Sequence, residues 1–424
     1  MPKIDIFEQD LTQATSTLGT DIPFIPGFAV AKEGKEIPYE VPTLCTSVES
    51  FKALFGDTPY IFEDAYECHS IQVGDADRSY IMARELLKLG MPVYYYAIKP
   101  EADEGMNPIN TFIKKISAYF ESKDLADKDE YTIKYITTGG YANYDPADTS
   151  DALNVAKKMI AIAEDRGDAI ALIEGRDTIN YSSLEYDNKD SLYYQLNNDK
   201  GIQSTYAAAF IPWAKYLIGD NGITLPACYA YLSALAKTIK TGSNWLAIAG
   251  ITRGSIPKID KPHTAPGTRI SNVIANSYQP LAAEPNKQIA LNAITQINPY
   301  GLTIWGNRTL QEIKEGTVAG NFLNTRNMAS DIKKVAYKVA KSLMYEQNND
   351  ALWIRFKSEV SPYLDQLKAG SGISDYKLIR SNVNREGKKL SREQFACSIK
   401  IFPVAAVESF EIAIVMSDAD VEVQ

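Results

Sequence analysis

Apolar and polar positions between residues 46 and 310 follow the helical period in some segments and the strand period in others. Helices are predicted over Val48–Phe55 behind a Thr46–Glu49 capping box, Arg78–Leu89 behind Asp77, Asn107–Ser122, Asp151–Glu164, Thr205–Ile218, Pro226–Lys240 and Pro285–Ile297. Strands are predicted over Met91–Lys99, Tyr131–Thr137, Asp168–Glu174, Trp245–Ile251 and within Asn298–Leu310. Such alternation is typical of an α/β sheet flanked by helices.

Beyond Leu310 the pattern changes to two successive helices followed by two strands. The first helix is indicated up to about Glu346 by apolar residues at helical spacing, namely Met328, Ile332, Val335, Val339 and Leu343. The second helix is predicted over Ala351–Ala369, with a kink or restart at Ser361-Pro362. Gly370–Gly372 would end it, and strands are predicted over Tyr376–Ser381 and Ala396–Phe402. We therefore expect an α+β domain in this part.

Each end of the chain carries a short strand pattern without a nearby partner in the sequence. The alternating positions are Lys3, Ile4, Asp5, Ile6 and Phe7 at one end and Phe410, Ile412, Ile414 and Met416 at the other. The polar stretch Glu8–Thr20 separates the first strand from the body, and Pro403–Glu408 connects the body to the second. An unpaired strand is a hazard unless it finds a sheet. If that sheet belongs to another copy, the chain becomes a link in a polymer.

The charge of the chain argues against nucleic-acid binding. Its 424 residues carry a formal net charge of −9, the pI is about 5.1, and Lys and Arg form no dense cluster. We find no apolar run of a signal peptide or of the ~18–20 residues that a membrane helix needs, so membrane insertion is not expected. The cysteines form no CxxC pair, which favours a reducing place of synthesis.

Residue patterns typical of catalysis or of cofactor binding are not found. The chain has two histidines, His69 and His263, and neither lies near a nucleophile signature. Cys68 beside His69 could suggest a metal pair, but an ordinary partly buried pair is the simpler interpretation. Gly250–Gly254 and Gly370–Gly372 complete no phosphate-binding motif and are interpreted as turns or caps. We predict no catalytic, cofactor-binding or metal-binding residue.

One face of the predicted helix that ends near Glu346 is basic. Its lysines are Lys333, Lys334, Lys338 and Lys341. One interpretation is a solvated helix face. The other is a cationic docking face for an acidic protein partner, since the stripe is too small for nucleic acid.

Several segments together resemble the contractile tail sheath family, which forms the outer sleeve of contractile phage tails, R-type tailocins and related injection machines. Leu291–Leu310 resembles the family's asparagine-containing helix, glycine turn and strand that ends in a Trp-Gly-x-Arg-Thr-Leu exit, here with Trp305, Gly306 and Arg308. Leu323–Ile373 resembles its carboxy-terminal pair of helices, with an Asn-rich break before Trp353. Further similar segments are Ser50–Gly56, Ala152–Glu174, Thr205–Leu217 and the closing strand near Phe410–Met416.

The resemblance implies a polymer of six-membered rings stacked helically around an inner tail tube, without a cofactor. The terminal strands would complete sheets on adjacent copies, with the linkers acting as hinges during contraction. The basic stripe would face the tube, and baseplate and tail terminator proteins would be further partners. The particle would be a virion tail or an injection particle, assembled in the cytoplasm of the producing bacterial cell.

The resemblance also implies a subtilisin-like central domain without proteolysis. The expected division is an arm and linker over 1–24, an amino-terminal α/β part over 25–150, a subtilisin-like sheath domain over 151–305, a tube-facing α+β domain over 306–405 and an arm over 406–424. The alternatives are a hydrolase with a subtilisin-like fold and a nucleotide-binding α/β enzyme. The missing triad and glycine fingerprint count against both.

Overall fold

The structure of the protein is a computed structural model, which describes part of the chain. The described residues are 21–31, 36–66, 71–101, 107–142, 151–175, 202–218, 221–240, 244–256, 261–262, 291–297, 299–311, 319–383 and 387–406. Both predicted terminal strands, Lys3–Phe7 and Phe410–Met416, lie outside these residues. So do His69 and His263.

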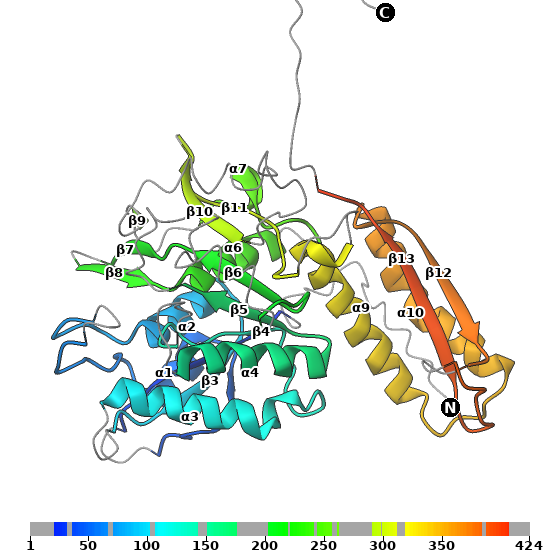
Figure 1. Ribbon diagram of the computed structural model, residues 1–424, viewed down its shortest axis with the longest axis horizontal. Coiled ribbons are helices and arrows are strands. Elements are labelled where there is room, and N and C mark those ends of the chain that lie inside the picture. Colours follow the sequence, from blue (N-terminus) through cyan, green and yellow to red (C-terminus); the bar gives the residue numbers. More distant parts are fainter. Residues whose placement is uncertain are drawn as a thin grey trace, which may run out of the picture.

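A mixed sheet of eight strands forms the centre of the molecule (Figure 1). Its strands are β1 Pro23–Phe28, β2 Thr43–Cys45, β3 Val93–Ile98, β4 Tyr135–Ile136, β5 Ile170–Glu174, β6 Ala207–Ile211, β10 Leu291–Ile297 and β11 Gly301–Trp305. They lie in the order β11-β10-β6-β5-β4-β1-β3-β2. All neighbours from β10 to β3 are parallel, whereas β11 and β2 pair antiparallel at the two edges.

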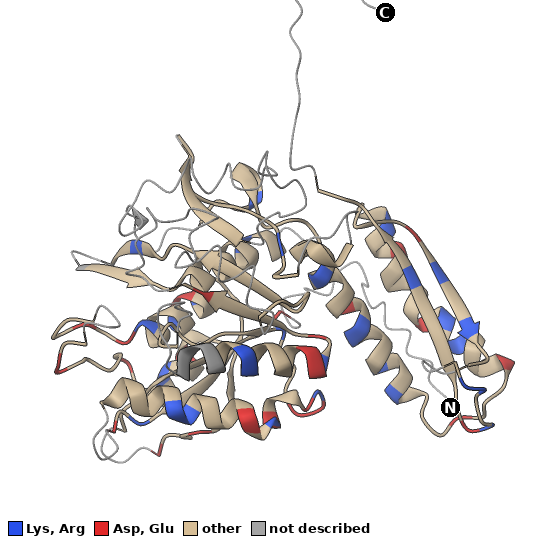
Figure 2. Ribbon diagram, in the orientation of Figure 1, with Lys and Arg blue, Asp and Glu red and all other residues tan. Residues whose placement is uncertain are grey.

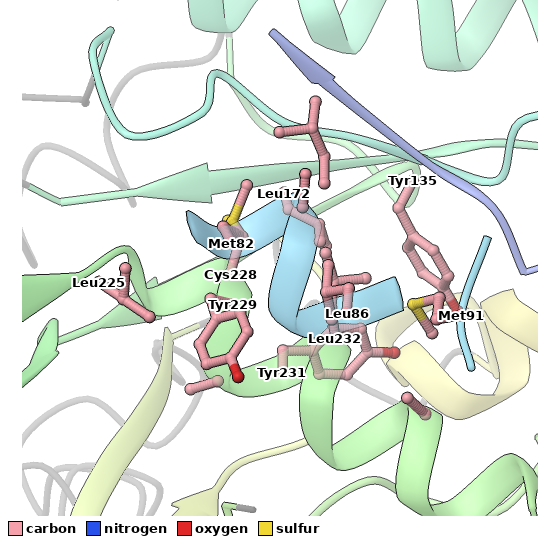
Figure 3. Packing of buried hydrophobic residues seen from close by; sticks show 14 of the residues in the cluster. Met82, Leu86, Met91, Tyr135, Leu172, Leu225, Cys228, Tyr229, Tyr231 and Leu232 are labelled. Carbon is pink, nitrogen blue, oxygen red and sulfur yellow. The ribbon is translucent and has the colours of Figure 1, made fainter. Parts of the chain in front are cut away.

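Helices cover both faces of this sheet. One face is covered by α1 Val48–Phe55, α2 Arg78–Lys88 and α6 Ala227–Ile239, and the other by α3 Pro108–Ser122, η3 Asp124–Ala126 and α4 Asp151–Arg166. The strands β1, β3, β5 and β6 are buried at every position, as expected for parallel strands between two helical layers. Figure 3 shows the side where α2 and α6 pack, with Met82, Leu86 and Leu232 close to Leu172 of β5.

Aromatic side chains fill much of the opposite layer. The ring of Phe24 on β1 lies 5.7 Å from that of Tyr96 and 5.9 Å from those of Tyr119 and Phe120, measured between centroids. Phe24 is fully buried. Rings of this size remove large apolar areas from water, so this layer contributes strongly to the stability of the sheet.

A second, smaller domain follows the central sheet along the chain. It consists of η5 Ala319–Asn321, α9 Leu323–Ser342, α10 Asp350–Ala369, β12 Ile373–Ser381 and β13 Ala396–Pro403. The two strands are antiparallel and lie against α10, on the far side from α9 (Figure 1). Between β6 and β10 in the sequence lie a three-stranded sheet and a short helix. They are formed by β7 Ala214–Ile218, β8 Asn221–Leu225, α7 Gly250–Arg253 and β9 Lys261–Pro262.

Most predicted helices are confirmed, including two of their capping residues. The side chain of Asp77 accepts hydrogen bonds from the first turn of α2, and Asn107 does the same for α3. The cap of α1 was wrong by one position. Ser47 and Ser50 form the capping box there instead of Thr46 and Glu49. The predicted α/β class of the central part is also confirmed.

Some segments predicted as one kind of element form another. Thr205–Ile218 contains the strands β6 and β7 in place of a helix, and the predicted helix Pro285–Ile297 ends in strand β10. Trp245–Ile251 is a turn that leads into α7, so the strand predicted there was wrong. The helix predicted to kink or restart at Pro362 continues through it as α10.

Candidate assembly site

The sheet β12–β13 has open edges, whereas the central sheet has protected ones. In the described part of the chain, neither β12 nor β13 pairs on its outer side. Within the edge strand β11, Thr303 forms an antiparallel bridge with Ser255, and the backbone NH of Ile304 donates to the carbonyl oxygen of Gly254 at 2.8 Å. The other edge strand, β2, has three residues. Long open edges are places where a further strand can bind.

The two faces of this small sheet differ in polarity. Side chains that face α10 join its apolar core, namely Tyr376, Leu378, Cys397, Ile399 and Ile401. The opposite face carries Lys377, Lys400 and the exposed apolar residues Ile379 and Phe402. A strand added at either edge can therefore place apolar side chains over the core and polar ones outside.

A buried charge cluster joins the small domain to the central sheet. The ammonium group of Lys134, just before β4, lies 2.5 Å from a carboxylate oxygen of Asp21 and 2.7 Å from one of Asp331 on α9. The side-chain amide of Asn244 donates to the same two carboxylates, at 2.8 Å to Asp331 and 3.2 Å to Asp21. All four residues are buried. Through Lys134 and Asn244, the cluster ties Asp21, the first described residue of the chain, to Asp331 on α9.

The cluster holds its charges because they compensate one another. Burial alone would lower the pKa of Lys134, but attraction to Asp21 and Asp331 outweighs burial and raises that pKa above its ordinary value. Burial raises the pKa of Asp331, and Lys134 offsets part of that rise. Removing one partner would leave an uncompensated buried charge, which is strongly destabilising.

Further polar contacts along the first half of α9 support the same junction. Asn327 accepts a hydrogen bond from the hydroxyl of Tyr135 at 2.9 Å, and its amide donates to Tyr231 at 2.8 Å. Asn324 and Asn307 bond to each other twice, at 2.8 and 3.1 Å. Such directional contacts define how the helix sits on the sheet domain.

The turn after α10 has glycines because a tryptophan lies against it. The indole NH of Trp245 donates to the carbonyl oxygen of Gly370 at 3.0 Å. A Cβ atom at Gly370 would lie 2.4 Å from the Trp245 ring, and one at Gly372 would lie 2.7 Å from it. The glycines therefore allow a close approach of Trp245, in addition to the turn that the sequence indicated.

Two lysines of the predicted basic stripe contact the body of the same chain. The ammonium group of Lys333 donates to the carbonyl oxygen of Gly167 at 2.9 Å and to the hydroxyl of Tyr206 at 2.7 Å. Lys334 donates to the carbonyl oxygen of Ile133 at 2.9 Å, and burial lowers the pKa of Lys334 to about 8. Both residues hold α9 on the central domain.

The other two lysines lie nearer the end of α9. Lys341 forms an exposed ion pair of 2.7 Å with Asp129, which also accepts from Tyr337 at 3.0 Å. Lys338 is exposed and forms no ion pair with any described residue. Figure 2 shows these basic positions along the helix. Lys338 is therefore the stripe residue whose charge is most available to a partner.

The motif residues Trp305, Gly306 and Arg308 lie in the connection between the central sheet and the small domain. Trp305 is 39% exposed at the end of β11, and Gly306 follows it. The backbone NH of Arg308 donates to Asn292 at 2.7 Å, and its guanidinium lies 4.4 Å from the centroid of the Phe322 ring. These contacts connect β10 and β11 to the start of α9.

Trp353 belongs to the small domain itself. Its ring lies 6.2 Å from that of Phe356 on the same helix and 6.1 Å from that of Phe395, just before β13. Trp353 is half-buried and packs at the edge of the α9–α10 core. The contacts point to a packing role for this residue.

The usual ligand position of a parallel α/β sheet is filled by the chain itself. Such ligands bind beyond the carboxyl ends of strands where the strand order reverses, which here is between β1 and β4. The Asp77 carboxylate lies there and accepts from Ser79 at 2.7 Å and Tyr141 at 2.5 Å. A Cβ atom at Gly139 would lie 2.1 Å from the carbonyl oxygen of Pro26. Close backbone packing at this point counts against a nucleotide site.

The described residues show neither a cluster of metal ligands nor a membrane-spanning helix. No group of three or more potential metal-ligating His, Cys, Asp or Glu side chains occurs among the described residues. Within those same ranges, no helix has both the length and the apolar character required to cross a membrane.

Sequence reasoning missed the buried cluster of Asp21, Lys134, Asn244 and Asp331. Two signals were present. Lys134 interrupts the apolar and aromatic run of Tyr131–Ile136, and Asp331 lies beside the apolar face of its helix. A charge within a predicted buried face indicates a partner, but the sequence does not show which distant residue supplies it.

Comparison with known proteins finds relatives of one kind. Residues 319–417 match the phage tail sheath C-terminal domain. The tail sheath protein of Vibrio phage KVP40 is 21% identical over 269 residues, covering 62% of this chain and 36% of that protein. The tail sheath protein of Enterobacteria phage T4 is 23% identical over 336 residues, covering 74% and 48%. The match thus spans less than half the length of these relatives.

Solved structures of contractile systems share the fold. A chain of the anti-feeding prophage baseplate superposes with a TM-score of 0.61 at 14% identity, covering 98% of this chain and 99% of that one. The anti-feeding prophage sheath and the PVC sheath complex, both in the contracted state, give TM-scores of 0.58 at 16% identity. These cover 99% of this chain and 99% and 98% of theirs.

Proposed function

We propose that this chain is a member of the contractile tail sheath family and the structural subunit of a contractile sleeve, since residues 319–417 match the sheath C-terminal domain and tail sheath proteins are similar to it. The observation that carries the proposal is the β12–β13 sheet with its open outer edges, in a domain that matches the sheath family. In the sleeve, copies assemble as stacked six-membered rings around an inner tail tube. Baseplate and tail terminator proteins contact its ends.

Neighbouring copies are joined by their terminal strands. The arm over Lys3–Phe7 and the arm over Phe410–Met416 add to the β12–β13 sheets of adjacent copies. This is strand addition, in which main-chain hydrogen bonds provide affinity and alternate side chains provide fit. The same surface recurs on every copy without closing on itself, so the contact propagates into a polymer. Residues 1–20 and 407–424 serve as arms, and the part over 306–405 accepts them. The amino-terminal arm is shorter than the expected 1–24, because Asp21 is buried and Phe24 lies within β1.

Contraction is a rigid-body change that leaves the exchanged strands in place. The linkers act as hinges while the bodies rotate and slide. They are Glu8–Thr20 and the part of Pro403–Glu408 that follows Val404, because Pro403 ends β13 and the NH of Val404 donates to the carbonyl oxygen of Gly372. New contacts between bodies release the free energy that drives the tube through a target cell envelope. The sleeve belongs to the tail of a virion or to an injection particle, assembled in the cytoplasm of the producing bacterium.

The role is structural rather than catalytic. Packing at the switch point between β1 and β4 speaks against a nucleotide-binding enzyme. The central domain takes a subtilisin-like form without proteolysis, and a hydrolase is the alternative. The expected boundary at residue 150 does not divide it, because strands from both sides of that residue form one sheet. Hydrolysis of a peptide or ester panel by the purified chain would favour that alternative.

Assembly of the full chain tests the proposal. Purified protein examined by sedimentation and negative-stain microscopy is expected to form tubes or stacked rings. Deleting residues 1–20 should leave a folded chain that forms no sleeve. A double change of Ile4→Asp and Ile6→Asp should act in the same way, whereas Gln9→Ala in the linker should not. Normal assembly of the deleted chain would contradict strand exchange.

A further inference from the structure

Two lysines lie directly opposite each other on the outer face of the β12–β13 sheet. Lys377 pairs in register with Lys400, and both side chains are exposed. Neither forms an ion pair with a described residue, and the nearest carboxylate on β12, that of Asp375, is bound to Lys368 at 2.9 Å. Like charges opposite each other destabilise a strand pair. Asp375 interacts with Lys377 through space but accepts its hydrogen bond from Lys368, so two like charges remain side by side on the outer face. Figure 2 shows basic segments on both strands.

Each terminal arm carries one carboxylate that can compensate this lysine pair. Side chains alternate between the two faces of a strand. In the amino-terminal arm, Ile4 and Ile6 directed toward α10 place Asp5 on the outer face. In the carboxy-terminal arm, Phe410 and its alternate apolar residues directed inward place Glu411 on the outer face.

We propose that Lys377 and Lys400 set the register of the exchanged strands by pairing with Asp5 and Glu411 of neighbouring copies. The completed sheet then carries one row of charges across its outer face, in the order acid, lysine, lysine, acid. This inference rests on the proposed strand exchange and adds the residues that make it specific.

A charge row is needed because apolar burial does not distinguish every register. A shift of one residue exposes the apolar side chains and is rejected, but a shift of two keeps them inward. In the amino-terminal arm, a shift of two can place Lys3 beside the two lysines and add a third like charge. In the carboxy-terminal arm, it places Ala413 where Glu411 would pair. The lysine pair thus penalises the registers that apolar burial allows.

Charge reversal at one lysine should affect folding and assembly in opposite directions. Lys377→Glu replaces a repulsive cross-strand pair by an attractive one, so the melting temperature of the unassembled chain should stay the same or rise. The same change removes the attraction for an arm carboxylate, so assembly should weaken. If Lys377 had a merely structural role, the melting temperature and the extent of assembly would change in the same direction.

The experiment measures the critical concentration for polymerisation of the full chain by sedimentation. Asp5→Lys should raise it about fivefold at low salt, and combination with either Lys377→Glu or Lys400→Glu should return it to within about twofold of the unmodified chain. Glu411→Lys should be rescued by the other of the two lysine changes. The control is Lys357→Glu, an equal charge change at an exposed site on α10 that should have no effect. High salt should shrink all these differences.

The outcomes separate this inference from the function on which it rests. If deletion of residues 1–20 abolishes assembly while Asp5→Lys assembles normally, the charge row is wrong and strand exchange stands. If neither double variant restores assembly, the charge row is also wrong. If the deleted chain itself assembles normally, strand exchange fails and the charge row fails with it.

Discussion

The two main sheets of the molecule differ in how their edges are treated. The central sheet is covered by helices on both faces, one edge strand has three residues, and the other continues into bonds with Gly254 and Ser255. The β12–β13 sheet is covered on one face by α10, and its strands of nine and eight residues have open outer edges within the described ranges. The central sheet therefore has protected edges within a single chain, whereas the small sheet leaves both outer edges open among the described residues.

This contrast separates stability from assembly. The central sheet buries aromatic and aliphatic side chains on both faces and can fold without a partner. The small domain has a narrower core, formed by α9, α10 and one face of the small sheet. A fold with a rigid body and an open sheet can exchange strands with neighbours while the body stays intact.

The largest expected effect is on the free energy of unfolding, when one core side chain is truncated in each sheet. Phe24→Ala on β1 should lower the free energy of unfolding by about 4 kcal/mol, because a fully buried ring leaves a cavity. Leu378→Ala on β12 should lower it by about 1–2 kcal/mol in the unassembled chain, because that side chain is already half-exposed. Urea denaturation followed by circular dichroism measures both. Equal losses would show that the small sheet is as complete as the large one.

Much of the central fold could be predicted from local sequence rules. The main errors of that prediction are two strands that were expected to be helices. Asp77 and Asn107 could be identified because a capping side chain acts within its own turn. The segment that forms β6 was predicted as a helix because a strand buried on both faces is apolar throughout and has no two-residue alternation. The segment that forms β10 was predicted as a helix because Pro285 was interpreted as a first-turn proline. For β6, Pro212 directly after Ile211 marks the end of the strand and argues against a continuous helix.

The junction between the sheets should respond to loss of its central charge. Lys134→Met should lower the free energy of unfolding by about 3 kcal/mol, because Asp21 and Asp331 would remain buried without the ammonium group that bonds to both. The matched control combines it with Asp21→Asn and Asp331→Asn, which removes the charges together and should recover most of the loss. A single variant as stable as the original chain would contradict the role assigned to the cluster.

The candidate site could be predicted in part. Helical spacing predicted the basic stripe. It did not predict which lysines bond to the central domain and which stay exposed, because whether a lysine faces Gly167 or solvent depends on how α9 docks. The Lys377–Lys400 pairing depends on the register of β12 and β13, which the sequence alone does not give.

A pH effect should arise in the central sheet and leave the small one unaffected. Burial raises the pKa of Glu174 at the end of β5 from 4.5 to about 8, and contacts with Cys228 oppose that rise. Because the folded state holds this proton more tightly than the unfolded state, the contribution is fully present below pH 4.5 and is lost as pH rises toward 8.

Glu174→Gln removes that loss, since glutamine stays neutral. The variant should match the original chain near pH 4 and exceed it by about 2 kcal/mol at pH 6, from about 1.4 kcal/mol per pH unit above 4.5. Urea denaturation at both pH values measures the difference. Glu121→Gln, at an exposed site on α3, serves as the control. A constant offset between pH 4 and pH 6 would contradict the assignment.

The smallest effect on folding and the most selective effect on assembly are expected at Lys338. Lys338→Glu should leave the melting temperature unchanged, because the side chain is exposed and forms no ion pair with any described residue. Lys333→Glu should lower the melting temperature, because its ammonium group bonds to Gly167 and Tyr206.

If α9 faces the inner tube, as we propose, Lys338→Glu should weaken co-sedimentation with tube protein while assembly of the chain by itself is unchanged. The effect should decrease with added salt, because an exposed charge pair is screened. Unchanged co-sedimentation would assign Lys338 to a solvated helix face. The remaining lysines would then serve to hold the small domain on the body of the same chain.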